Sequence, residues 1–311
     1  MDGMLDPRGL YAFTADQPAP DELSEPVLLF CLNGFIDAGQ AGRLAADHLL
    51  ATLDHRLLVS FDLDQLYDYR ARRPVMTFDG DHWESYQAPS LNIYLAQDMA
   101  GTGFLLMVGP EPDVQWERFV AAVTGLVEHY GVRLSLGVHA IPMGVPHTRP
   151  VGVTAHATRP ETVSDYRQWV GRVQVPGQMT GLLELRLGEA GRDAAGFAVH
   201  VPHYLAQNEY PAAAQVLLES VGRLAGLRLP TQALATAGEK VQQMIAEQLA
   251  DQPDVAAVVR ALEEQYDTIA AEQAESVGGG VPADLPTADE LGAELERFLA
   301  AENERRGRGE G

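Results

Sequence analysis

The sequence contains very little cysteine and lysine and no long apolar run. Its one cysteine, Cys31, cannot form a disulfide within the chain. Cys31 lies inside an apolar stretch, which is typical of a small buried residue rather than of a nucleophile. No apolar stretch approaches the roughly 18 residues that span a membrane. Because a secretory signal is also absent, we expect a cytoplasmic protein with no membrane partner.

Positive charge is scarce as well. The 311 residues include 22 lysine and arginine residues against 44 aspartate and glutamate residues, so the formal net charge is -22. Such a surface repels phosphodiester backbones, and no run of lysine or arginine forms a local basic patch. We therefore expect no nucleic acid partner, and we interpret the acidity as a source of solubility.

The motifs of several enzyme classes are absent. Serine residues are few, and no G-x-S-x-G nucleophile motif occurs. Five histidines lie in or beside expected strands and loops: His139, His147, His156, His200 and His203. A metal site requires two ligands on one face with acidic support, and the spacing of His200 and His203 does not indicate this without a helix. We expect no catalytic residue, no metal site and no cofactor.

The patterns that are present predict alternating strands and helices. Residues 26–34, PVLLFCLNG, form an apolar run typical of a strand covered on both faces. Residues 37–53 have apolar positions at helical spacing, which predicts a helix with Asp37 as its N-cap. Further on, Asp79-Gly80 between apolar and aromatic residues predicts a hairpin turn. The alternation continues to about residue 228, which predicts an α/β sheet with parallel neighbours.

The character of the sequence changes near residue 229. From there to residue 275, good helix formers recur at helical spacing with no strand signal, and a break falls at 251–253. A Gly/Pro-rich stretch and a short amphipathic segment follow. We therefore divide the chain into a solvated N-terminal lead-in at 1–23, an α/β core domain at 24–228, a helical extension at 229–275, a linker at 276–288, and a terminal helix with a disordered tail at 289–311.

The turn after the first strand has the glycine spacing of a phosphate-binding loop. Gly34 and Gly39 are separated by four residues, between a strand and a helix. The next residues are Gln40 and Ala41, where a nucleotide-hydrolysing loop has lysine and serine or threonine. Asp37 lies in the same loop and would repel an anion, which a helix N-terminus could otherwise bind. We interpret the glycines as a structural corner that permits a sharp turn and close packing.

A small-molecule site is a second possibility. A phosphorolytic or nucleosidase-type site would use arginine to bind phosphate, for which Arg149 and Arg159 are candidates. It would also need a carboxylate near the base, for which Glu184 and Glu209 are candidates. No sequential motif joins these residues. The alternative function is therefore that of a small-molecule or nucleoside-binding protein, or of an enzyme with such a site.

Several segments together carry a resemblance to a known family. In order they are NGFIDAGQAGRLAADHL, MVGPEPDVQWERF, IPMGVPHTRP, VPGQMTGLLEL and HVPHYLAQNEYPAAAQVLLE. They resemble the proteasome assembly chaperone family, in its bacterial and archaeal branch, over about residues 24–228. The family's early Gly-Phe-x-Asp-Ala-Gly turn and its later Pro-x-Tyr and Pro are matched by Gly34, Phe35, Asp37, Ala38, Gly39, Pro202, Tyr204 and Pro211. High alanine, glycine and arginine usage is compatible with an actinobacterial member.

The resemblance implies a fold and a mode of action. The fold is α/β and similar to phosphorylase/hydrolase-like proteins: three α/β/α layers with a mixed, largely parallel sheet, here with a C-terminal helical extension. The family implies self-association, for which we favour a trimer, and contact with proteasome subunits. Some archaeal members dock through a hydrophobic-Tyr-x C-terminus. This sequence ends in Arg308-Gly309-Glu310-Gly311, so we do not expect docking by that device.

These observations favour a non-enzymatic, oligomeric protein that acts by binding other proteins. The loops after the first and last strands are the predicted binding sites. In the first loop, glycine and aspartate residues shape the turn, and in the last loop a polar and aromatic rim offers a contact surface. The residues of these two loops are Gly34, Asp37 and Gly39, followed by His203, Tyr204 and Tyr210.

Overall fold

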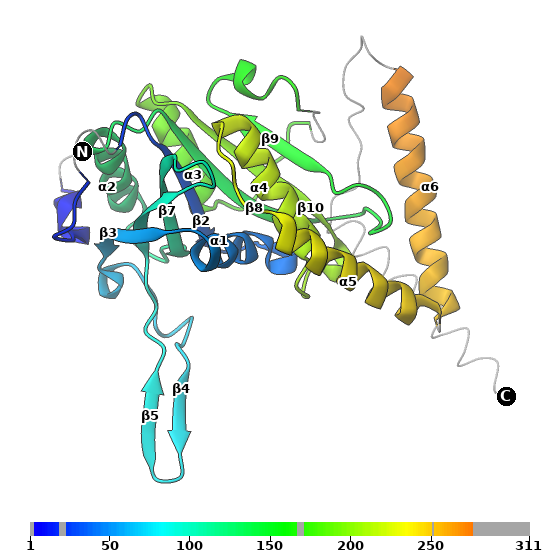
Figure 1. Cartoon of the computed structure of the whole chain (residues 1–311), viewed down its shortest axis with the longest axis horizontal. Helices are drawn as coiled ribbons and strands as arrows, with labels where there is room; N and C mark the ends of the chain where they lie inside the picture. Colours follow the sequence, from blue (N-terminus) through cyan, green and yellow to red (C-terminus); the bar gives the residue numbers. More distant parts are fainter. Residues whose placement is uncertain (1–2, 19–22, 167–170, 251, 276–311) are drawn as a thin grey trace.

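An eight-stranded mixed sheet forms the centre of the protein in a computed structural model, which describes residues 3–18, 23–166, 171–250 and 252–275 (Figure 1). The strand order is β1-β3-β6-β7-β2-β8-β10-β9. The four central strands β7, β2, β8 and β10 are parallel, and the outer strands pair antiparallel. The linker and terminal helix predicted for 276–311 lie outside the described residues.

The described residues form ten strands. Eight belong to the central sheet, and β4 and β5 form a separate hairpin. The predicted turn at Asp79-Gly80 is confirmed, because it joins these two strands. The bounds are β1 (Tyr11–Phe13), β2 (Val27–Asn33), β3 (His55–Phe61), β4 (Met76–Asp79), β5 (His82–Tyr86), β6 (Asn92–Gln97), β7 (Gly103–Pro110), β8 (Leu134–Met143), β9 (Val153–Ala157) and β10 (Ala194–Pro202).

Six α-helices and five short 3-10 turns complete the described part of the chain. None of these helices is long and apolar enough to cross a membrane. The helices are α1 (Ala41–Thr52), α2 (Trp116–His129), α3 (Met179–Glu189), α4 (Pro211–Ala225), α5 (Gln232–Ala250) and α6 (Pro253–Glu275). The 3-10 turns are η1 (Pro7–Leu10), η2 (Ala38–Gln40), η3 (Leu63–Gln65), η4 (Pro160–Val163) and η5 (His203–Leu205).

The helices cover both faces of the sheet, and β2 shows how the sequence specifies this arrangement. Its alternate side chains Leu29 and Cys31 pack in one apolar cluster with α1 and α4. Leu28 and Phe30 point the other way and pack with α2 and α3. Because both faces are buried, the strand is a continuous apolar run instead of an alternating one. The predicted three-layer α/β/α fold with a mixed sheet is confirmed.

The helical extension begins directly after α4. Pro211 stands at the first position of α4, where its missing N–H is not needed, and Gly226 ends the helix with a left-handed φ of 73°. Helix α5 packs against α4 and continues beyond the sheet, and α6 turns back at its end (Figure 1). The break between α5 and α6 falls at 251–252, within the predicted break, and the C-terminal helical extension is present as predicted.

The N-terminal segment differs from the expectation of a solvated lead-in. Strand β1 pairs antiparallel with β3 at the edge of the sheet, and Leu10 is fully buried. Arg118 of α2 anchors the segment by donating to the backbone oxygen of Asp6 at 2.8 Å and 3.0 Å. A strand of three residues is too short to show a period in the sequence, which is why the pattern did not indicate it.

Candidate functional site

The carboxyl ends of the parallel strands β2, β7, β8 and β10 meet at one edge of the sheet. Sites in α/β proteins form at this edge, because the loops that leave parallel strands converge there. Here the converging segments are the turn before α1, the loop after β7, the loop at 144–152 and the η5 turn. Five of the six residues predicted for the binding loops lie in the first and last of these segments, and Tyr210 lies just beyond the η5 turn.

Asp37 closes the N-terminus of α1. Its carboxylate accepts hydrogen bonds from the backbone N–H of Gly42 at 2.8 Å and of Arg43 at 3.0 Å. The helix itself begins at Ala41, so the capping carboxylate lies one short 3-10 turn ahead of it. Burial raises the pKa of Asp37, and the two N–H donors lower it in part. The free N–H groups that would bind a phosphate are therefore already used by the chain's own carboxylate.

Glu111 has the same role at the N-terminus of α3, and sequence reasoning missed it. It follows β7 and is 9% exposed, and its carboxylate accepts from the backbone N–H of Phe35 at 3.1 Å and of Met179. Gly34 leaves room for this carboxylate, because a Cβ at that position would overlap Glu111. The available signal was an acid directly after a buried strand, at the edge where loops converge.

Gly39 and Tyr210 come together although they are far apart in the sequence. Gly39 has a left-handed φ of 65°, donates its N–H to the Ala206 oxygen, and accepts from the Tyr210 N–H at 2.8 Å. A Cβ on Gly39 would lie 2.7 Å from the Tyr210 Cβ, so this close approach requires glycine. Tyr210 is only 1% exposed, and its hydroxyl lies 3.3 Å from the Gln242 amide of α5. Tyr210 is thus buried under the extension and does not line an exposed rim.

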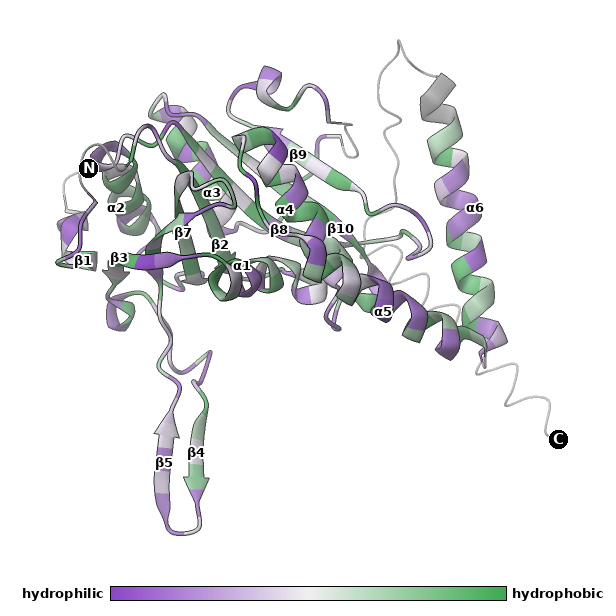
Figure 2. Cartoon of the chain, viewed as in Figure 1, coloured by the Kyte–Doolittle hydropathy of each residue, from purple (hydrophilic) through white to green (hydrophobic). Residues whose placement is uncertain are grey.

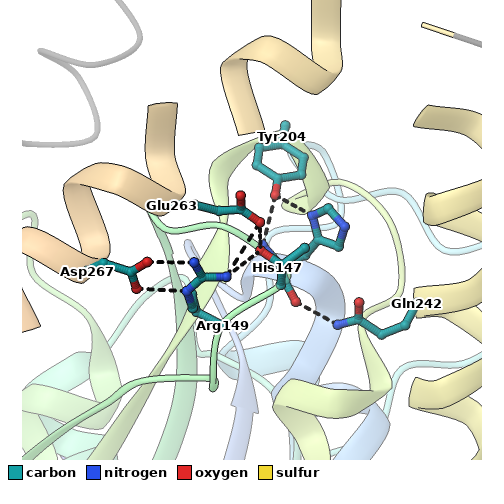
Figure 3. A network of polar contacts seen from close by, with 7 residues as sticks. His147, Arg149, Tyr204, Gln242, Glu263 and Asp267 are labelled. Carbon is teal, nitrogen blue, oxygen red and sulfur yellow. Dashed lines mark hydrogen bonds and ion pairs between the residues drawn. The ribbon is translucent and has the colours of Figure 1, made fainter. Parts of the chain in front are cut away.

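Tyr204 anchors the loop at 144–152 to η5 (Figure 3). Its hydroxyl accepts from the His147 backbone N–H at 2.9 Å and lies 2.7 Å from the His147 Nδ1. The hydroxyl and this ring nitrogen form a second hydrogen bond between the same two residues. Burial lowers the pKa of His147 and raises that of Tyr204 to about 12, so both side chains are neutral at neutral pH. His203 is beside Tyr204, and burial lowers the pKa of His203.

The same loop holds the helical extension to the core. Arg149 forms two bonds with Asp267 of α6, at 2.8 Å and 2.6 Å, and lies 3.5 Å from Glu263 (Figure 3). Thr148 donates to Glu263. On α5, Gln242 donates to the His147 backbone oxygen at 2.8 Å. A two-bond arginine–carboxylate pair has defined geometry, so this junction specifies where α6 sits.

The three residues of the alternative ligand cleft do not converge. Arg149 is engaged by α6, and Arg159 pairs with Asp193. Glu184 on α3 instead contacts the ring of His156, with 2.7 Å between Oε2 and Nδ1. Within the described residues, no group of three or more histidine, cysteine, aspartate or glutamate side chains could hold a metal ion. Cys31 is buried, which raises the pKa of its thiol.

The hairpin of β4 and β5 is an exposed feature of the described chain with several apolar side chains. Every residue of both strands is exposed, including Phe78 at 55% and Trp83 at 63%. These two rings contact each other with centroids 5.1 Å apart. Figures 1 and 2 show the hairpin projecting from the core, with hydrophobic positions along β4. Exposed apolar clusters of this kind mark interaction surfaces.

The fold and this surface define an α/β protein with a helical extension and an exposed hairpin. At the carboxyl ends of its parallel strands, Asp37 and Glu111 cap the N-termini of α1 and α3. A family model of the PAC2 family matches residues 31–249. The chain belongs to the PAC2 family, which confirms the family inferred from the sequence. No curated protein matches the chain.

Several solved structures are similar to this chain. A Mycobacterium tuberculosis protein of unknown function, Rv2714, is 48% identical with a TM-score of 0.81, covering 85% of this chain and 93% of that one. The M. tuberculosis proteasome-assembly chaperone homologue Rv2125 is 26% identical with a TM-score of 0.69, covering 75% and 99%. The Pyrococcus furiosus archaeal proteasome activator PbaB is 15% identical with a TM-score of 0.56, covering 76% and 98%, and shows the fold alone.

Proposed function

We propose that this protein acts without catalysis, as a homo-oligomer that binds other proteins in the manner of proteasome-assembly chaperones. The exposed hairpin is the observation that carries this proposal. A two-stranded hairpin is at best marginally stable alone in water, and its unpaired edges invite association. Met76 and Tyr86, about half exposed, extend the apolar surface around Phe78 and Trp83. A surface with this composition is stabilised when a partner covers it.

The occupant we propose for the hairpin is a second copy of the same chain. Arg70 and Arg73 are exposed at its base, in a chain whose formal net charge is -22. These two arginines are complementary to acidic side chains of another copy, although the hairpin itself carries Asp79, Asp81 and Glu84. When each copy contacts the next through two different patches, the copies form a closed ring if the rotation that relates neighbours returns to the first copy. We expect a trimer of this kind.

Proteasome subunits are the proposed external partners. Support comes from the family and from the similarity to a proteasome-assembly chaperone homologue over 75% of this chain. The carboxyl edge supports a non-catalytic role, because the N-termini of α1 and α3 are both occupied by internal carboxylates, Asp37 and Glu111. A phosphate-bearing substrate would find these donors already used.

Native mass spectrometry of the full chain tests the proposal. The protein is measured alone and mixed with proteasome α-subunits of the same organism. We expect a closed homo-oligomer that forms a discrete complex with free α-subunits. A homo-oligomer that ignores the α-subunits contradicts the proposed partner, and a monomer contradicts the proposed assembly as well.

A further inference from the structure

One face of the β4–β5 hairpin is apolar. It carries four large exposed side chains, which we call the hairpin face: Met76, Phe78, Trp83 and Tyr86. These residues form two directly opposite pairs in the register of the strands, and alternate residues of a strand point to the same side. The pair between them, Thr77 and Ser85, points the other way, and its two hydroxyls bond each other at 2.9 Å. The hairpin is therefore an amphipathic ribbon.

A second apolar surface lies at the carboxyl edge of the sheet, where three segments meet around Glu111. The Glu111 carboxylate accepts from the N–H of Phe35 and from that of Met179 at the start of α3. A Cβ on Gly177 would lie 3.7 Å from the Trp116 ring, so the segment before α3 also passes beside the start of α2. Each segment carries one exposed apolar side chain, and together we call these the edge patch: Phe35 (68%), Val114 (47%) and Val175 (69%).

The segment before α3 has the pattern of a strand without being one. Residues 172–177, RVQVPG, belong to no helix or strand, and all six are exposed. Val173 and Val175 alternate with Gln174, which is typical of an extended segment with one apolar side. Within the described part of the chain nothing buries that side, since Val173 is 52% exposed and Val175 69%. This segment, like the hairpin, gains burial only from a partner.

The charges of the two surfaces are opposite. Arg172 opens the exposed segment beside the edge patch, and it has no ion pair among the described residues. The hairpin carries three acidic residues at and near its turn: Asp79, Asp81 and Glu84. Complementary charge of this kind directs two surfaces toward each other and sets their orientation.

We propose that the hairpin face of one copy covers the edge patch of the next copy. This inference rests on the proposed homo-oligomer and names the second of the two patches that a ring requires. Arg72, at the base of the hairpin, bonds Asp113 and the Glu111 backbone oxygen, both at 2.6 Å, so the hairpin begins next to its own edge patch. The hairpin then projects away from the core and leaves that patch exposed for a neighbour (Figure 1).

Two hairpins packed on each other fit the charges less well. Such a contact would bring the acidic turn residues of both copies together, and like charges across an interface oppose association. The edge patch offers Arg172 instead, because the carboxylate of Glu111 is already bonded by two backbone N–H groups and that of Asp113 by Arg72.

Cysteine cross-linking in the full chain tests the contact. Cys31 is buried, so the added cysteines are the accessible thiols. Chains with Trp83→Cys and chains with Val175→Cys are co-expressed and treated with a short bismaleimide. We expect a product that joins one chain of each kind, identified by peptide mass spectrometry. Trp83→Cys with Met244→Cys is the matched control and should give no product, although Met244 on α5 is 59% exposed.

A substitution in the edge patch gives a second readout. Val175→Asp should weaken self-association by about tenfold or more, because it places an unpaired carboxylate under the acidic hairpin. Dilution followed by native mass spectrometry measures this. The urea midpoint of the protomer should not change, since Val175 is exposed. Met244→Asp is the control and should associate as the unmodified chain does.

The outcomes separate this contact from the proposed function. An oligomer without the 83–175 product overturns the contact and leaves self-association standing. A product that joins two Trp83→Cys chains also overturns it, because the hairpins then pack on each other. Association that Val175→Asp leaves unchanged overturns it as well, and the patch is then free for a different protein. A monomer at all concentrations overturns both the contact and the proposed assembly.

Discussion

The central strands and the β4–β5 hairpin have the same secondary structure and opposite surroundings. All nine residues of β10 are buried, whereas every residue of β4 and β5 is exposed. The core strands are held by packing on both faces, with α1 and α4 on one side and α2 and α3 on the other. The described residues leave every position of the hairpin exposed, and Phe78 and Trp83 pack on each other. The difference teaches that packing on both faces stabilises the core strands, whereas the hairpin would gain such packing only from the partner proposed above.

The largest expected effect is a cavity in the core. Phe197 of β10 is fully buried in the cluster with α1 and α4. Phe197→Ala should lower the free energy of unfolding by about 3–5 kcal/mol, because it removes buried apolar contacts and leaves a void. Urea unfolding measures this. Trp83→Ala on the hairpin is the comparison, and a loss of similar size there would contradict the distinction between the two regions.

Acid should destabilise the core next most strongly. Burial lowers the pKa of both His139 and His200 to about 4, from an ordinary value of 6.5. The unfolded chain therefore takes up protons first as the pH falls below 6.5, and the folded state loses stability between pH 6.5 and 4. At pH 5 each histidine should lower the free energy of unfolding by on the order of 2 kcal/mol relative to pH 7.5.

Urea unfolding at pH 7.5 and pH 5 checks this dependence. His200→Gln should remove one histidine's share of the loss, because glutamine does not titrate. A slope that is as steep in His200→Gln as in the unmodified protein would contradict burial as the cause.

Loss of the α1 cap should have a smaller effect. Asp37→Ala leaves the N–H groups of Gly42 and Arg43 without their acceptor. The free energy of unfolding should fall by about 1 kcal/mol. Asp37→Asn keeps one acceptor oxygen and should lose less. Asp79→Ala, in the exposed hairpin, is the control, and a cap effect no larger than this control would contradict the role of Asp37.

The helical extension is less buried than the core strands and less exposed than the hairpin. Arg149, in the loop at 144–152, connects α6 to the core. Arg149→Ala removes the ion pairs to Asp267 and Glu263. We expect faster hydrogen exchange in α6 with unchanged exchange in β8 and β10, because α6 opens without global unfolding. Arg159→Ala breaks a different ion pair and should leave α6 exchange unchanged. Protection of α6 that survives Arg149→Ala would contradict this junction as its anchor.

The sequence predicted the fold well where periodicity was strong. The apolar run of β2, the helical spacing of α1 and the turn at Asp79-Gly80 all indicated elements that the structure contains. Short or irregular elements were missed. Strand β1 has only three residues, which are too few to show an alternating pattern.

The candidate site was harder to predict because its contacts join distant positions. Glu111 reaches the N-terminus of α3, 68 residues away, and Arg149 reaches Asp267, 118 residues away. The role of Asp37 as a cap could be predicted, because its partners are five and six residues ahead. Local spacing specifies local bonds, whereas the order of strands in the sheet specifies which loops meet.

The mass of a hairpin variant in solution tests the central distinction most directly. Phe78→Ser combined with Trp83→Ser should leave the unfolding free energy of the protomer within about 0.5 kcal/mol, since both side chains are exposed. Leu185→Ser combined with Met244→Ser changes equally exposed apolar residues elsewhere and is the matched control.

Native mass spectrometry should show the hairpin variant as a monomer and the control as the same closed oligomer as the unmodified chain. A hairpin variant that keeps the oligomer mass would contradict the inference that a second copy covers the hairpin.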